Sequence, residues 1–129
     1  MHRLPPINEL RYLVGTELTQ ITVDPYQVSF YLTDQQAGTT LTSGYAFEFE
    51  QSNGQAEVYK PAEKSSAFGS SHFHKLLEDK VVGVDLSVDS LRLCLSFARG
   101  SRLTILSELD GYESGTIACG GGSKKFWVF

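Results

Sequence analysis

Residues 18 to 32 read LTQITVDPYQVSFYL, and residues 81 to 95 read VVGVDLSVDSLRLCL, with almost the same apolar spacing at a shift of 63 positions. In both stretches apolar residues alternate with polar ones, which is the period of a half-buried β-strand. A short polar segment with turn-forming residues interrupts each stretch. Both stretches therefore predict a β-hairpin, and their likeness predicts two related units in one chain.

A third strand extends each unit. GTTLT at residues 38–42 matches GSRLT at residues 100–104, now at a shift of 62, so each unit is expected to be a three-stranded antiparallel meander. Apolar residues at helical spacing predict a short helix before each meander, at residues 7–14 and 72–79. A single meander cannot bury its apolar face, so the two should share one core.

We therefore predict a mainly β (α+β) fold, in which two repeated antiparallel three-stranded meanders form a sandwich or a partly open barrel with two short helices. The internal pseudo-repeat covers residues 13–50 and 76–113. The Asn53-Gly54 dipeptide predicts a further hairpin turn. The expected strands cover residues 17–24, 27–33, 39–50, 56–60, 80–87, 90–97, 101–107, 114–119 and 124–128. The expected core consists of Ile21, Val23, Val28, Phe30, Leu32, Val84, Leu86, Leu91, Leu93, Leu95, Leu103 and Ile105.

The composition is that of a single globular domain over residues 1–129, with 41% hydrophobic and 20% charged residues. The net charge of −4 argues against binding to nucleic acid or to an anionic membrane, because both require a basic surface. The first fifteen residues contain two prolines and no long apolar run, so we expect neither a signal peptide nor a membrane span, and a cytoplasmic protein.

No catalytic signature is found in the sequence. Cys94 and Cys119 lie in strand-like apolar stretches and are expected to be buried free thiols. His72 and His74 lack a third ligand nearby and are expected to be polar surface residues. The segment CGGGSKKF lacks the spacing of a phosphate-binding loop and predicts a hairpin turn instead. We accordingly expect a protein without enzymatic activity, metal or cofactor.

The motifs LVGTELTQITVD, GSRLTI and YESGTIACGGG resemble a family of small bacterial proteins of unknown function. Its pattern is Leu-x-Gly-x-x-Val-x-x-Val, then a Gly turn before a Leu-x-Ile strand, then a late Tyr-Glu with a Gly-rich turn. The matching positions here are Leu13, Gly15, Leu18, Ile21, Gly100, Leu103, Ile105, Tyr112, Glu113 and Gly120 to Gly122. The second unit departs from the pattern, since Glu78 stands where Gly is expected. The shared residues are structural, so no functional residue is carried over.

Small acidic proteins of this kind are similar to immunity proteins of polymorphic or contact-dependent toxin systems, which bind and neutralise a cognate toxin domain, often a nuclease. This resemblance implies a basic toxin domain as the partner. The segment from Tyr45 to residue 63 contains four glutamates and a single lysine, Lys60, so its local charge is negative. The expected partner-binding residues are these glutamates: Glu48, Glu50, Glu57 and Glu63. The outer face of the hairpin is expected to carry Glu48 and Glu50, with Glu57 as a further candidate. The alternative is a small-molecule or regulatory binding module that uses a cavity between the two meanders. The oligomeric state is left open.

Overall fold

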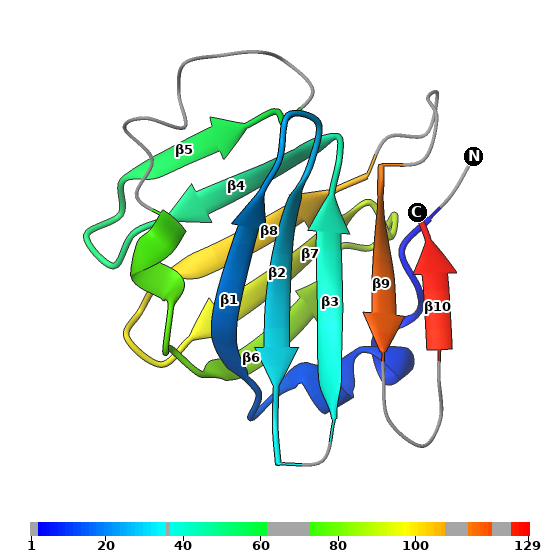
Figure 1. Ribbon diagram of the computed structural model, residues 1–129, viewed down its shortest axis with the longest axis horizontal. Coiled ribbons are helices and arrows are strands. Elements are labelled where there is room, and N and C mark those ends of the chain that lie inside the picture. Colours follow the sequence, from blue (N-terminus) through cyan, green and yellow to red (C-terminus); the bar gives the residue numbers. More distant parts are fainter. Residues whose placement is uncertain (1–2, 36, 62–72, 108–113, 120–124) are drawn as a thin grey trace.

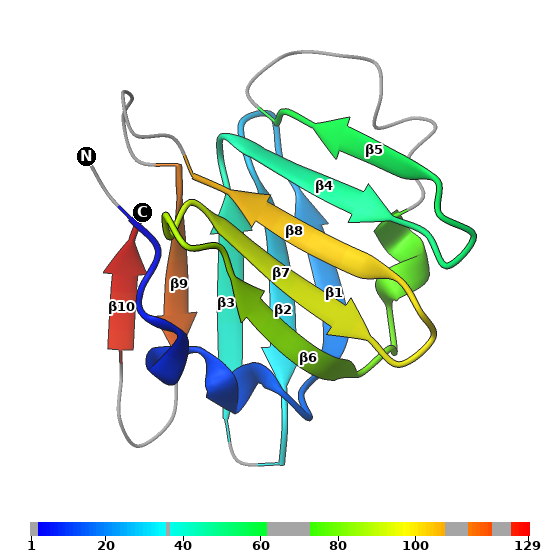
Figure 2. The ribbon, with the colours of Figure 1, turned by 180° about the vertical axis from the view of Figure 1, so that it is seen from behind.

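The computed structural model describes residues 3–35, 37–61, 73–107, 114–119 and 125–129. Within these ranges the chain forms two five-stranded antiparallel sheets. Figures 1 and 2 show the two sheets stacked face to face, with their strands running in different directions. The predicted mainly β fold is confirmed. Of the two closures that the sequence left open, the structure has the open sandwich.

Each sheet contains one of the predicted meanders and one additional hairpin. Sheet A has the order β1-β2-β3-β9-β10, with β1 (Glu17–Val23), β2 (Val28–Thr33), β3 (Gly38–Ser43), β9 (Gly115–Cys119) and β10 (Lys125–Val128). Sheet B has the order β5-β4-β8-β7-β6, with β4 (Ala46–Glu50), β5 (Ala56–Tyr59), β6 (Val81–Leu86), β7 (Arg92–Phe97) and β8 (Arg102–Leu106). The hairpin β4-β5 therefore completes the sheet of the second meander, and β9-β10 completes the sheet of the first.

The prediction of one strand over residues 39–50 is wrong. The chain leaves sheet A after Ser43 and enters sheet B at Ala46, so this segment forms the two strands β3 and β4. At the crossing, the backbone N–H groups of Gly44 and Tyr45 donate to the carbonyl of Ser114 at 2.8 and 3.0 Å. The alternation of buried residues continues in phase across the break, and for this reason the sequence pattern does not reveal it.

The strand register corrects the predicted alignment of the two meanders. Ile21 pairs with Phe30, and Val84 pairs with Leu95, so the shift is 63 in the first strand and 65 in the second. Four residues, 24–27, separate the last paired residues of the first hairpin, and six residues, 87–92, separate those of the second. Since the difference is even, the buried and exposed faces remain as predicted.

The edge strands β1 and β6 join the two sheets. Glu17 forms an antiparallel bridge with Lys80, and four backbone hydrogen bonds of 2.7–3.0 Å connect residues 15–18 to residues 78–81. We call these two segments the sheet junction. Gly15 and Glu78 occupy it with φ values of +92° and +67°. Glu78 is thus a non-glycine residue in the left-handed region, where a Cβ atom is unfavourable.

The predicted helices are short 3-10 helices. Residues 7–14 contain η1 (Ile7–Glu9) and η2 (Arg11–Leu13), which pack beside β6. Figure 2 shows this segment against the part of sheet A that sheet B does not cover. The second helix, η4 (Phe73–Leu76), inserts the ring of Phe73 against Phe47 and Tyr59 with centroid distances of 5.5 and 5.1 Å.

Most of the predicted core is buried. One continuous cluster contains seven of the predicted residues: Val28, Phe30, Leu32, Leu93, Leu95, Leu103 and Ile105. Ile21, Val84 and Leu86 pack against this cluster and are partly buried, and Leu91 is also partly buried. Val23 was predicted wrongly, because its side chain is 48% exposed at the end of the edge strand β1.

Replacement of Leu93 by Ala should destabilise the protein by about 2 to 5 kcal/mol, because Leu93 is fully buried and its truncation leaves a cavity. Urea denaturation measures the change in the free energy of unfolding. Val88→Ala is the matched control, since Val88 lies fully exposed in the turn after β6 and its truncation should have almost no effect. A loss below about 1 kcal/mol for Leu93→Ala would contradict this core assignment.

Replacement of Glu78 by Gly should stabilise the protein by roughly 1 kcal/mol, because Gly adopts a positive φ without a steric penalty. Glu78→Ala removes the same charge but retains a Cβ atom, so it should leave the stability nearly unchanged. Gly15→Ala should cost roughly 1 kcal/mol for the same backbone reason. Equal effects of Glu78→Gly and Glu78→Ala in thermal and urea denaturation would show that the backbone conformation is not the cause.

Candidate functional site

Two of the predicted partner-binding residues lie together on the outer face of sheet B. Glu48 and Glu50 are successive outward residues of β4, because Phe47 and Phe49, which alternate with them, point into the core. Both carboxylates are partly exposed. Figure 2 shows that no described helix or strand covers this face of β4. The two carboxylates are therefore accessible to a partner.

Glu57 does not lie on this face. It pairs with Phe49 across the hairpin, and directly paired residues point to the same side of a sheet, so Glu57 projects from the opposite face of the edge strand β5. There its carboxylate accepts a hydrogen bond from the hydroxyl of Tyr59. The predicted grouping of Glu57 with Glu48 and Glu50 on one outer face is wrong. Glu63 lies outside the described residues.

The surroundings of Glu48 and Glu50 contain residues that the sequence did not single out. Val58 pairs with Glu48 and has a side chain that is 53% exposed. Arg102 of β8 pairs with Glu50 on the other side. The site is thus an exposed apolar side chain beside two carboxylates, with a guanidinium group at its inner margin. The alternation of β5 could have indicated Val58, but only once the hairpin register was known.

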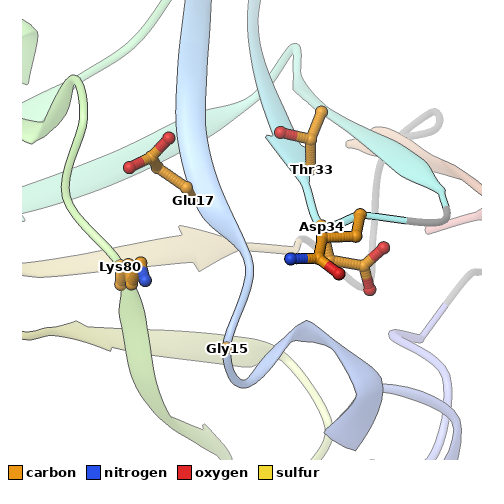
Figure 3. Close-up of a pocket in the computed structure, with 6 residues that line it drawn as sticks. Gly15, Glu17, Thr33, Asp34 and Lys80 are labelled. Carbon is orange, nitrogen blue, oxygen red and sulfur yellow. The ribbon is translucent and has the colours of Figure 1, made fainter.

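A polar pocket of about 610 Å³ lies at the opposite end of the sandwich, beside the sheet junction. Figure 3 shows Glu17 of β1 and Thr33 of β2 on adjacent strands, with Asp34 next to Thr33 and Lys80 across from them. Ligand pockets for small molecules are mostly apolar with a few placed polar groups. Apart from Gly15, every residue that lines this pocket has a polar or charged side chain, and the pocket lies at the surface instead of between the meanders.

The groups considered for catalysis have structural positions. His74 is exposed on η4, and His72 lies outside the described residues. Neither Cys94 nor Cys119 forms a disulfide, as predicted, but both are partly buried where the sequence predicted buried thiols. The buried carboxylate of Asp79 accepts hydrogen bonds from the backbone N–H groups of Lys80 and Arg99, which holds the turn before β6. Its partners are those of a structural aspartate.

Tyr12 is a half-buried phenol near Cys119. Its oxygen accepts a hydrogen bond from the hydroxyl of Thr39 at 3.2 Å. Burial raises the pKa of Tyr12 above its usual value of 10.0, the hydrogen bond from Thr39 opposes this change, and the proximity of Cys119 adds to it. A phenol with a raised pKa remains neutral at ordinary pH and is not an activated nucleophile or base.

Over the described residues, no three side chains of His, Cys, Asp and Glu come together in a way that could hold a metal ion. No helix in the same ranges is long and apolar enough to cross a membrane. No family model matches the chain, and comparisons with curated proteins and with solved structures likewise give no match.

The raised pKa of Tyr12 predicts a pH dependence of stability. Between the unfolded pKa of 10.0 and the higher folded pKa, the unfolded chain loses this proton while the folded chain keeps it, so stability falls as the pH rises through that window. The loss of unfolding free energy above pH 10.0 should be smaller in Tyr12→Phe than in the wild-type protein. Tyr26→Phe, at an exposed position, is the control and should behave as the wild-type protein does.

Proposed function

We propose that the chain is an immunity-type protein without catalytic activity, which binds and neutralises a basic toxin domain through the hairpin β4-β5. The observation that carries this proposal is the exposed group of Glu48, Glu50 and Val58 on the outer face of sheet B. Protein interfaces combine an apolar centre with a polar rim, and this group has that composition at a small scale.

The corrected position of Glu57 changes the shape of the proposed contact. The carboxylates of Glu48 and Glu50 project from one face of the hairpin, and that of Glu57 projects from the other. Negative charge therefore surrounds the free edge of sheet B instead of covering one flat patch. A basic cleft that receives this edge would meet carboxylates on both walls, whereas a flat basic surface would meet only two of them.

The charge distribution favours a basic protein over nucleic acid or membrane as the partner. A nuclease holds phosphates with Lys and Arg side chains, and carboxylates presented in their place both block the site and accelerate association. The polar surface pocket offers no comparable support for the alternative of a small-molecule module, because no apolar side chain lines it, whereas pockets for such ligands are lined mostly by apolar side chains.

Reversal of the two outward carboxylates tests the proposal. The partner is the toxin domain encoded beside this protein, or the basic protein that co-purifies with it in stoichiometric amount. Glu48→Lys/Glu50→Lys should lower the association rate constant about tenfold or more at low salt. The difference should shrink at high salt, because the screening length falls from about 10 Å at 0.1 M to about 3 Å at 1 M.

The matched control is Glu17→Lys/Glu78→Lys, which changes the net charge by the same amount at the sheet junction. This control should lose much less of its association rate, since both substitutions lie at the sheet junction beside β6, which is three strands away from β4 in sheet B. Circular dichroism establishes that both double variants fold. Unchanged association of the folded Glu48→Lys/Glu50→Lys variant would remove the hairpin β4-β5 from the interface.

A further inference from the structure

The outer face of sheet A differs from that of sheet B in having almost no charge. The outward residues at its centre are uncharged and none is buried: Ser29, Tyr31, Thr40, Thr42, Thr116 and Ala118. Among the described residues that point outward from this sheet, Glu17 at the start of β1 is the one with a charge. Charged residues usually make up about 25–35% of a protein surface, so this face is depleted in them.

Packing does not require this depletion, as sheet B shows. In sheet A, Thr40 of the meander strand β3 pairs with Ala118 of β9. At the equivalent position of sheet B, Arg102 of the meander strand β8 pairs with Glu50 of β4. The same fold thus accommodates Arg and Glu where sheet A has Thr and Ala. The neutral character of sheet A therefore belongs to its surface chemistry and not to its architecture.

Two aromatic side chains stand on this uncharged face. Phe126 of β10 is 65% exposed and points outward, because it pairs with Ala118. Tyr31 of β2 is 38% exposed, and its ring covers the backbone of Gly38 on the neighbouring strand. Depletion of charge together with exposed aromatic residues is the compositional signal of a protein interface. Figure 1 shows no described segment in front of β2, β3 or β9.

We propose that this face binds a second copy of the same chain in a two-fold symmetric dimer. Each copy has a net charge of −4, so two copies repel one another wherever their carboxylates would meet. Among the described residues the outer face of sheet A carries one carboxylate, Glu17, and that of sheet B carries Glu48, Glu50 and Asp85, so fewer carboxylates would meet over sheet A. Its hydroxyl groups both donate and accept hydrogen bonds, so the face is complementary to itself, as a two-fold interface requires.

The size of the face fits a weak dimer. Five strands about 4.8 Å apart, each about six residues long at roughly 3.3 Å per residue, give a face of about 24 by 20 Å. Because side chains make the surface uneven, each copy could bury roughly 600 Å² of accessible surface on this face. The total for two copies is close to the lower limit of about 1,200 Å² for specific interfaces. Both hairpins β4-β5 would remain free, because they belong to the outer layers of the dimer.

Analytical ultracentrifugation of the full chain over micromolar to millimolar concentrations tests the proposal. The wild-type protein should sediment as a dimer at the upper end of this range. Thr40→Arg, which copies the residue found at Arg102, should raise the dissociation constant about tenfold or more, because two guanidinium groups would face each other near the two-fold axis. Phe126→Lys should act in the same direction, and the side chain that it replaces is 65% exposed.

The matched control is Thr104→Lys, at the central outward position of sheet B, which pairs with Glu48. It should leave the dimer intact. A wild-type protein that is monomeric at millimolar concentration would overturn the proposal, as would a control variant that weakens the dimer as much as Thr40→Arg does. If the wild-type protein is monomeric and Thr40→Arg instead abolishes binding of the toxin domain, the face docks the toxin and the self-association proposal fails.

Discussion

The sheet junction is the constraint on which the arrangement of the two layers depends. Its four backbone hydrogen bonds fix the edge strand of one meander against the edge strand of the other, so the two apolar faces are held opposite each other. Such a contact requires that the backbone of each segment, residues 15–18 and residues 78–81, bends away from the direction of its strand. The left-handed conformations of Gly15 and Glu78 provide that bend, and the second is retained although it places a Cβ atom in an unfavourable region.

The exchange of hairpins makes the two layers inseparable. The chain crosses to the other sheet after β3 and again after β8, so that Leu41 pairs with Ile117 and Phe49 pairs with Leu103. Neither half can complete its own five-stranded sheet from its own residues. Strand pairs so far apart in the sequence can form only after a long loop has closed, and the closure costs conformational entropy. β proteins with many such contacts typically fold slowly. The aromatic contacts of Phe73 and Phe30 with Phe47 join the layers in the interior.

The sequence predicted the features that follow from the alternation of apolar and polar residues. It missed the features that depend on which sheet a strand joins, on its place in that sheet and on the length of its turns. Strand positions, buried faces and both meanders followed from the period of two. The crossing at Gly44 was missed because Leu41 and Phe47 remain in phase, although they lie in different sheets. Val23 alternates like a core residue but lies at the end of an edge strand, where the neighbouring strand on one side is missing. The register of the second hairpin depended on a turn whose extra length left the alternation unchanged.

The error at Glu57 has a definite cause in the turn that precedes it. A two-residue turn at Asn53-Gly54 would pair Glu50 with Glu57 and place their carboxylates on the same face. In the structure Gly54 donates to the carbonyl of Gln51, adopts φ +90° and lets Gln51 donate to Gln55, so the turn contains one residue more. Glu50 then pairs with Ala56, and every later side chain of β5 changes face. The same one-residue change of register moves Glu57 away from the face of Glu48 and places Val58 beside Glu48. The exposed apolar side chain of the proposed interface therefore depends on the three-residue turn that ends at Gly54.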